Sequence, residues 1–244
     1  MVSRFQSVST SFSVGFPTHF STVLLAALIA VPAVMPALAQ HADPDLIQPA
    51  QTRGVSLDEL VTLMKRDHPP LGSRSDLCAI SPGQVGTTDH IWSDRPLFLW
   101  QGNVNQIIVR EFDTQENLWS KNVQTQATAT YQIPYDGIPL QPGQLYTWQL
   151  IADDSVIAEY TFEVLPTQER DRITTDLQTL DVQLRTTHPS NEAIALNYAQ
   201  YFAEQGLWSD ALNALYRGES QSPELEQAIN DIETYLCGDR SNGS

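Results

Sequence analysis

Hydrophobic and polar positions follow three different patterns along the chain. Residues 21–39 form an uncharged apolar run, residues 77–165 contain short β-type segments separated by turn residues, and residues 166–244 repeat apolar side chains at helical spacing. Short β-type segments with no helix between them are typical of antiparallel sheets, whereas spacing of three and four is typical of amphipathic helices. The pattern therefore predicts a multidomain α+β protein, in which an antiparallel β-sandwich precedes a C-terminal α-helical module.

The apolar run at the start of the chain has the properties of a secretory signal peptide. It ends in the small-residue pattern Ala-Leu-Ala at residues 37–39, and Arg4 is the only Lys or Arg before it. Pro32 and Pro36 interrupt the run, and its uninterrupted part is shorter than the ~20 residues that a bilayer crossing needs. We expect residues 1–39 to be removed on export, which leaves a periplasmic or extracellular protein without a transmembrane span. The alternative is an uncleaved segment that anchors the protein to the membrane.

Residues 40–76 are predicted to form an extended leader and one short amphipathic helix. Residues 40–55 are polar and contain two prolines. Ser56 and Glu59 have the spacing of a capping box, in which both side chains satisfy backbone N–H groups at the start of a helix. The apolar stripe of this helix is expected to pack on a larger part of the protein; its members are Leu57, Leu60, Val61 and Met64.

Residues 77–165 are predicted to form the β-sandwich domain. The clearest hairpin joins the last two predicted strands across Asp153, Asp154 and Ser155. Regular strand spacing with turn residues in between favours an antiparallel sandwich over a parallel sheet. The predicted strands are residues 97–100, 106–110, 118–123, 128–133, 146–152 and 156–164.

Leu140, Pro142 and Tyr146 have the spacing Leu-x-Pro-x-x-x-Tyr. This pattern resembles the tyrosine corner that precedes the penultimate strand of fibronectin type III domains and has a counterpart in immunoglobulin domains. The resemblance covers residues 78–165 and implies that the tyrosine hydroxyl bonds the backbone near the leucine. Trp100 and Trp148 fit the same topology as core aromatic residues.

Residues 166–244 are predicted to form four helices. The middle pair, at about residues 191–204 and 208–218, resembles one degenerate tetratricopeptide repeat (TPR), although Gly218 stands where alanine is usual. The resemblance implies two closely packed helices that present a surface to a partner protein, but one repeat alone cannot build the groove of an array. The positions that carry it are Tyr198, Ala199, Phe202, Gly206, Trp208, Ala211, Leu215 and Pro223.

The net charge narrows the range of binding partners. A net charge of −16 argues against nucleic acid and anionic membrane surfaces as partners, because both select for a basic face.

Cys78 and Cys237 are the two cysteines, and in an oxidising compartment they could form a disulfide. The alternative is two separate buried thiols, and the sequence leaves this choice open. The chain lacks the Cys-x-x-Cys spacing that is typical of zinc sites.

We find no pattern that predicts a catalytic, cofactor-binding or metal-binding residue. The chain lacks the Gly-x-Ser-x-Gly and His-Glu-x-x-His patterns, phosphate-binding glycine loops and an EF-hand loop. His41, His68, His90 and His188 each lie beside a predicted turn or helix break, where a solvated histidine is the ordinary interpretation. We therefore expect a non-enzymatic protein without a cofactor.

The expected function is docking of another exported protein by an envelope protein with a scaffolding role. One alternative is a carbohydrate-binding module that binds polysaccharide through exposed aromatic side chains, for which Trp92, Trp119 and Trp208 are the candidates. A second alternative is a hydrolase whose catalytic residues are brought together only by the fold. An exposed aromatic row would favour the first alternative, and converging His, Ser and Asp side chains the second.

Two segments of the predicted sandwich carry a further resemblance. Residues 77–83 form a proline-containing entry to the first strand, and residues 91–102 contain the run IWSDRPLFLWQG. Together they resemble exported cyanobacterial proteins of unassigned function with DUF928-type domains. The resemblance implies a bacterial, extracytoplasmic location and supplies no catalytic residue.

Overall fold

The computed structural model describes residues 56–67, 77–83, 87–125, 129–187, 190–217 and 222–238. These residues belong to one compact unit, Thr52–Ser244. The predicted signal peptide and the leader up to residue 55 lie outside the described residues, as do His68, His188 and Gly218. Among the helices that the structure describes, none is both long and apolar enough to cross a membrane.

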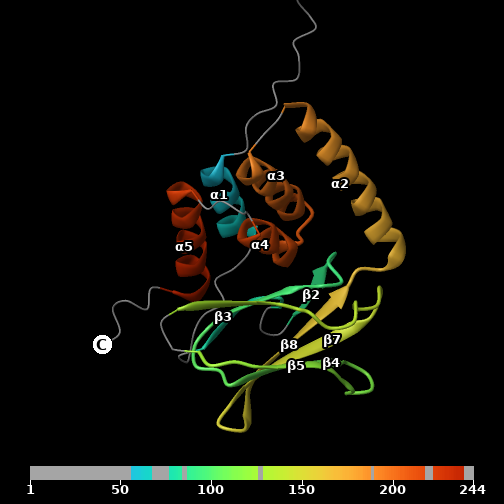
Figure 1. Cartoon of the computed structure of the whole chain (residues 1–244), viewed down its shortest axis with the longest axis vertical. Helices are drawn as coiled ribbons and strands as arrows, with labels where there is room; N and C mark the ends of the chain where they lie inside the picture. Colours follow the sequence, from blue (N-terminus) through green and yellow to red (C-terminus); the bar gives the residue numbers. More distant parts are fainter. Residues whose placement is uncertain are drawn as a thin grey trace, which may run out of the picture. The chain divides into compact units, whose positions relative to one another are not determined.

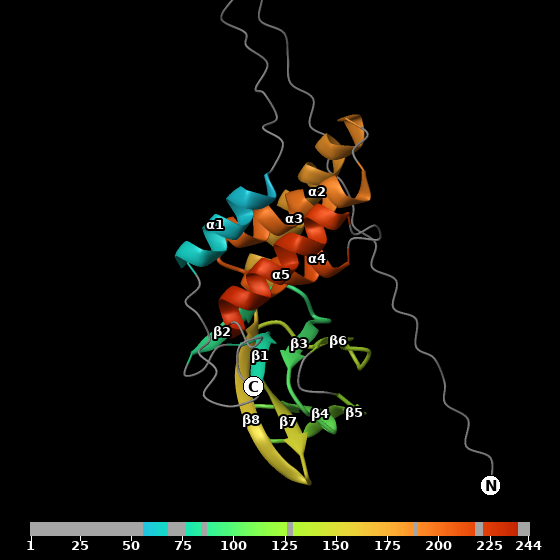
Figure 2. The same cartoon turned by 90° about the vertical axis from the view of Figure 1, so that its left-hand side faces the viewer.

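The strands of the described part form two sheets (Figures 1 and 2). One sheet has the order β1-β3-β6, and the other has the order β2-β8-β7-β4-β5. The bounds are β1 Cys78–Ser81, β2 Thr88–Ile91, β3 Leu97–Gln101, β4 Gln106–Glu111, β5 Asn117–Asn122, β6 Thr130–Pro134, β7 Leu145–Ala152 and β8 Ser155–Val164. Sheets and helices thus belong to one unit. This combination of strands and helices agrees with the α+β class predicted from the sequence.

Strand β2 corrects the prediction of a wholly antiparallel arrangement. It pairs with β8 in parallel, from Thr88 opposite Thr161 to Ile91 opposite Val164, whereas the other described pairs are antiparallel. Consecutive strands β1 and β2 belong to different sheets. The sequence did not predict β2, because its four residues Thr-Asp-His-Ile contain one buried side chain and no clear alternation.

Aromatic side chains from both sheets fill a shared core. Phe98 and Trp100 of β3 are fully buried, as are Trp148 of β7 and Phe162 of β8. The rings of Phe98 and Trp148 have centroids 4.9 Å apart. The core position predicted for both tryptophans is confirmed by their burial. Burying rings of this size is a main source of stability in a small sheet protein.

Tyr146 closes the turn that leads into β7. Its hydroxyl accepts a hydrogen bond from the backbone N–H of Gln141 at 2.7 Å and donates to the Gln141 carbonyl at 3.4 Å. Leu140 and Tyr146 are both buried, and Pro142 lies in the turn between them. The hydroxyl thus connects the start of the turn to the strand that follows it.

The described helices lie together on one side of the sheets (Figures 1 and 2). Ser190 and Ser222 cap two of them, since each hydroxyl accepts a hydrogen bond from a backbone N–H three residues later. The described helices are α1 Leu57–Asp67, α2 Thr167–Thr187, α3 Asn191–Glu204, α4 Trp208–Tyr216 and α5 Pro223–Cys237.

A second hydrophobic cluster joins the helices to the first sheet. It contains Leu60 and Met64 of α1, Ile80 of β1 and Leu99 of β3, together with apolar residues of all the other described helices. The amphipathic helix predicted to pack on a larger part, α1, is therefore buried along that stripe. This cluster extends across the domain boundary predicted at residues 165/166.

A disulfide joins Cys78 of β1 to Cys237 of α5, with Cα atoms 5.7 Å apart and 159 positions between the two residues in sequence. Both residues are buried in the cluster that the helices share with the first sheet. The bond therefore ties the first strand to the last helix.

Candidate functional site

The three tryptophans that the sequence offered as a binding surface lie in different surroundings. Trp208 is only 8% exposed and belongs to the helical core, so its assignment to the surface is wrong. Trp208 is the first residue of α4, and its large apolar ring packs inward among the helices. Trp119 is half-buried at the edge strand β5, where it stacks on Phe98 with centroids 5.7 Å apart. The half-buried Trp92 contacts the helices, so the three residues do not form one exposed row.

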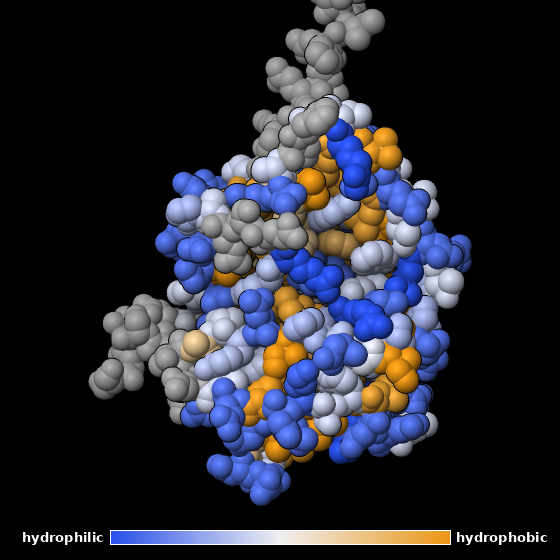
Figure 3. All heavy atoms as spheres, in the orientation of Figure 1, coloured by the Kyte–Doolittle hydropathy of each residue, from blue (hydrophilic) through white to orange (hydrophobic). Residues whose placement is uncertain are grey.

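Trp92 forms one wall of a cavity of about 480 Å³ between α3 and α4, which we call the Trp92 cavity. Ile194, Tyr198 and Phe202 of α3 belong to the apolar part of its lining. The polar part consists of Asn191 of α3, Asp210 and Asn213 of α4, and Arg217, which directly follows α4. A second cavity of about 360 Å³, lined also by residues of α2, shares Trp92, Tyr198 and Phe202 with it. Figure 3 shows the corresponding hollow, lined by hydrophobic residues, between α2 and the α3–α4 pair.

The position of Trp92 follows from its place in the chain. It comes directly after Ile91, the buried last residue of β2, and its ring packs against Phe202 with centroids 5.6 Å apart. Its indole Nε1–H donates to the Thr174 hydroxyl at 3.2 Å and to the Arg170 carbonyl at 3.3 Å. Residues of α2 thus bind the polar N–H of the indole, and Phe202 of α3 packs against its apolar ring.

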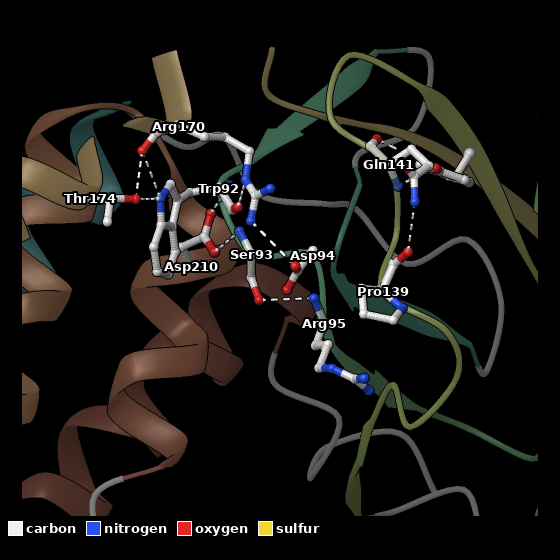
Figure 4. A network of polar contacts seen from close by, with 10 residues as sticks. Trp92, Ser93, Asp94, Arg95, Pro139, Gln141, Arg170, Thr174 and Asp210 are labelled. Carbon is white, nitrogen blue, oxygen red and sulfur yellow. Dashed lines mark hydrogen bonds and ion pairs between the residues drawn. The ribbon is translucent and has the colours of Figure 1, made fainter. Parts of the chain in front are cut away.

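The buried carboxylate of Asp210, on α4, forms hydrogen bonds with the backbone of Trp92 and Ser93 (Figure 4). Its two oxygens accept the backbone N–H groups of Trp92 at 2.6 Å and Ser93 at 3.0 Å. On the other side, Arg170 of α2 donates its Nε–H to the Trp92 carbonyl at 2.8 Å and lies 3.5 Å from the Asp94 carboxylate. Residues 92–94 are therefore fixed between α2 and α4.

Burial raises the pKa of Asp210 to about 7. The two backbone N–H groups and the positive charge of Arg170 lower the pKa, while the negative charge of Asp89 raises it. Asp89 lies on β2, where its carboxylate accepts hydrogen bonds from the backbone N–H of Gly83 and the hydroxyl of Ser209. The junction of β2 and α4 thus holds two carboxylates, and burial disfavours the ionised form of Asp210.

Asn213 is the second buried polar residue of the cavity lining. It is 9% exposed, and its Oδ1 atom has no hydrogen-bond partner among the described residues. Arg217, directly after α4, is exposed and lines the same cavity. It takes part in none of the ion pairs found in the described part of the chain. The cavity therefore combines buried acceptors with a cationic group near solvent.

The sequence singled out Trp92 but missed Asp210 and Asn213. An acidic residue in the first turn of a helix is ordinary, because it interacts favourably with the helix dipole. Only the fold brings residues 92–93 and Asp210 together, across 118 and 117 positions. A polar residue in the otherwise apolar pattern of α4 was the available signal, since Asp210 and Asn213 are both buried there.

Of the histidines considered in the sequence, His90 is the one that the structure describes, together with its surroundings. It lies on β2, with its Nε2 atom 3.4 Å from a carboxylate oxygen of Glu163 and a side chain that is 54% exposed. Among the described residues, no group of three or more His, Cys, Asp or Glu side chains is placed to hold a metal ion.

A family model matches most of the chain. The family is described as Domain of Unknown Function (DUF928), and its model matches residues 62–237. The match extends from within α1 to the end of α5 and includes every residue of the Trp92 cavity. A search of curated proteins found no match.

Proposed function

The chain belongs to the DUF928 family, and we propose that it is a non-enzymatic, exported protein that binds a segment of another exported protein in the Trp92 cavity. The observation that carries this proposal is the cavity itself, with its aromatic wall and its few buried polar groups. Binding sites commonly have a mostly apolar lining with a small number of placed polar groups. The volume of about 480 Å³ lies within the range of such sites.

The cavity is supported by rigid neighbours, which favours a binding role. Trp92 is held by hydrogen bonds to α2 and by the backbone contacts of Asp210 from α4. A site built on packed elements loses less conformational entropy on binding than one built on loose loops. Trp92 also supplies a wall that the α3–α4 hairpin lacks by itself. This explains how one TPR-like hairpin could present a cavity that normally needs several stacked repeats.

The finer description of the fold is part of the proposal. We interpret the two sheets as an immunoglobulin or fibronectin III-like sandwich, because their inner faces share one core and Tyr146 bonds the backbone at the corner before β7. We interpret α3 and α4 as a TPR-like hairpin, because Ala199 and Ala211 are completely buried where the two helices would pack closely. A sandwich joined to a helical hairpin is compatible with many functions, so the fold alone does not select one.

Export is supported by two independent features. The first is the apolar N-terminal run with its small residues at 37–39. The second is the disulfide between Cys78 and Cys237, because such bonds persist in oxidising compartments and are rare in the cytosol. Polysaccharide binding by a row of exposed tryptophans has less support, since Trp208 is buried in the helical core.

The proposal is tested by photo-crosslinking in the host's own envelope. Benzoylphenylalanine replaces Asn191, an exposed residue of the cavity lining, in the full chain, and crosslinked proteins are identified by mass spectrometry. The same experiment is repeated with Ala214→Trp, which fills the cavity, and with Ala193→Trp, a matched change on α3 at a half-buried residue outside the cavity lining. We expect one dominant protein partner with the parent chain and with Ala193→Trp, and a large loss with Ala214→Trp.

Circular dichroism and thermal unfolding establish that both variants fold. No crosslinked protein from the parent chain, or the same yield with the filled cavity, would contradict the proposal. Recovery of polysaccharide in place of protein would favour the carbohydrate-binding alternative.

A further inference from the structure

We propose that the Trp92 cavity binds the guanidinium group of an arginine side chain that the partner protein presents. This inference rests on the proposed function and deepens it, because it names the chemical group that the cavity recognises. Three features of the described residues lead to it: acceptor atoms in the lining, aromatic rings in the walls, and a local excess of negative charge.

The acceptors come from one face of α4. Asp210 and Asn213 are separated by three positions, which places their side chains next to each other on a helix. Each oxygen of Asp210 accepts one backbone N–H, and a carboxylate has about four acceptor sites, so acceptor capacity remains. Asn213 Oδ1 has no partner among the described residues. A buried acceptor without a donor is costly, and a ligand that donates to it removes that cost.

The walls suit a flat cation. Trp92, Tyr198 and Phe202 all line the cavity, and the Trp92 and Phe202 rings are tilted by 39° with centroids 5.6 Å apart. Aromatic faces attract cations, and the planar guanidinium group both stacks on rings and donates hydrogen bonds in its plane. A guanidinium group has five N–H donors, which matches an arrangement of two neighbouring acceptors better than a single ammonium point charge does.

The charges near Asp210 leave room for a cation. Asp89 adds a second negative charge, and Arg170 is the positive charge that acts on Asp210. Arg170 is already engaged with the Trp92 carbonyl and with Asp94. A buried carboxylate gains most from a counter-charge that also forms hydrogen bonds. The net charge of −16 would in addition favour the approach of an arginine side chain.

Arg217 refines the expected partner. It lies near solvent directly after α4, and the charges that act on Asp210 are those of Asp89 and Arg170. It therefore does not neutralise the buried carboxylate. A positively charged group beside the mouth disfavours a second cation in the bound segment and favours an acidic one. The expected segment thus carries an arginine next to an acidic residue.

The test uses three acetylated and amidated tripeptides with the isotope-labelled protein. The probes are Gly-Arg-Gly, Gly-Lys-Gly and Gly-citrulline-Gly, of which citrulline has the shape of arginine without its charge. Binding is followed by the NMR signal of the Trp92 indole N–H, assigned with Trp92→Phe. We expect a saturable shift with the arginine probe and affinities at least about tenfold lower for the other two.

Asn213→Leu and Ala193→Trp provide the paired variants. Asn213→Leu removes the unpaired acceptor while keeping a side chain of similar size, and it is expected to weaken the arginine probe. Ala193→Trp lies outside the cavity lining and is expected to leave it unchanged. Equal response to citrulline or lysine, absence of saturation with arginine, or an unchanged affinity in Asn213→Leu would overturn the inference.

A competition arm separates this inference from the proposed function. The arginine probe is added during photo-crosslinking from position 191, and it is expected to lower the yield of the partner where the citrulline probe does not. A partner that is captured but not displaced by the arginine probe overturns the inference and leaves the proposed function standing. Failure to capture any protein counts against the proposed function itself.

Discussion

The buried carboxylate of Asp210 predicts an unusual dependence of stability on pH. Burial raises its pKa from 3.8 to about 7, so the folded protein binds a proton more tightly than the unfolded chain does. A raised pKa contributes stability that is fully present below the unfolded value and is lost as the pH rises through the folded value. The stabilising contribution of protonated Asp210 should therefore disappear between about pH 4 and pH 7.

The size of the effect follows from the difference between the two pKa values. One pKa unit corresponds to about 1.4 kcal/mol, so this residue should lower the free energy of unfolding by about 3 kcal/mol between pH 5 and pH 8. The charged groups that act on it are Asp89 on β2 and Arg170 on α2, and their opposite signs partly cancel. The effect is measured by urea unfolding of the full chain at several pH values.

Asp210→Asn tests the assignment. The asparagine keeps one acceptor for the N–H groups of Trp92 and Ser93, so the variant is expected to be less stable overall by about 1–3 kcal/mol. Its stability profile should nevertheless be flatter by about 3 kcal/mol over pH 5 to 8, because the titrating group is gone. Asp171→Asn, an exposed carboxylate on α2, should keep the parent profile. If the Asp210→Asn and parent profiles run parallel, Asp210 does not titrate in this range and the reasoning fails.

Four further changes give separate predictions. The double change of Cys78→Ser and Cys237→Ser should lower the free energy of unfolding by about 5 kcal/mol in the chain-entropy model, measured by urea unfolding, and added reductant should then have no further effect. Tyr146→Phe should cost about 1 kcal/mol through the lost bond to the Gln141 backbone without changing the NMR spectrum of the cavity residues. Phe98→Ala should cost about 3–5 kcal/mol by leaving a void in the sheet core, and a smaller loss in thermal unfolding would contradict its packing. Asn213→Leu should raise the melting temperature, since it removes an unpaired buried acceptor, and a lower melting temperature would indicate that the acceptor has a partner.

The sequence predicted the longer strands because their side chains are sorted by face or are continuously apolar. Strands β3 to β8 all lie close to their predicted positions. The four-residue strands β1 and β2 were not identified, because segments this short carry little periodic signal. The parallel pairing of β2 with β8 depends on contacts between residues more than 70 positions apart, which no local pattern contains.

The site was less predictable than the fold for the same reason. An aromatic residue can be noticed in a sequence, and Trp92 was, but its role depends on contacts with α2, α3 and α4. Trp208 is noticeable in the sequence for the same reason, but it is buried. Asp210 and Asn213 interrupt the apolar pattern of α4, which is a signal of polar burial only once the helix is known to be covered. Long-range packing therefore decided which polar residues became part of the cavity.

The bond between Cys78 and Cys237 makes the region between them a covalent ring. This ring contains every described strand and helices α2 to α5, while α1 lies before it. A protease that cuts one peptide bond within the ring leaves two pieces that are still attached to each other. On a gel without reductant the cut protein would run near its original mass, and only reductant would release the fragments. A single cut in a surface loop would thus leave the helices and the sheets in one molecule.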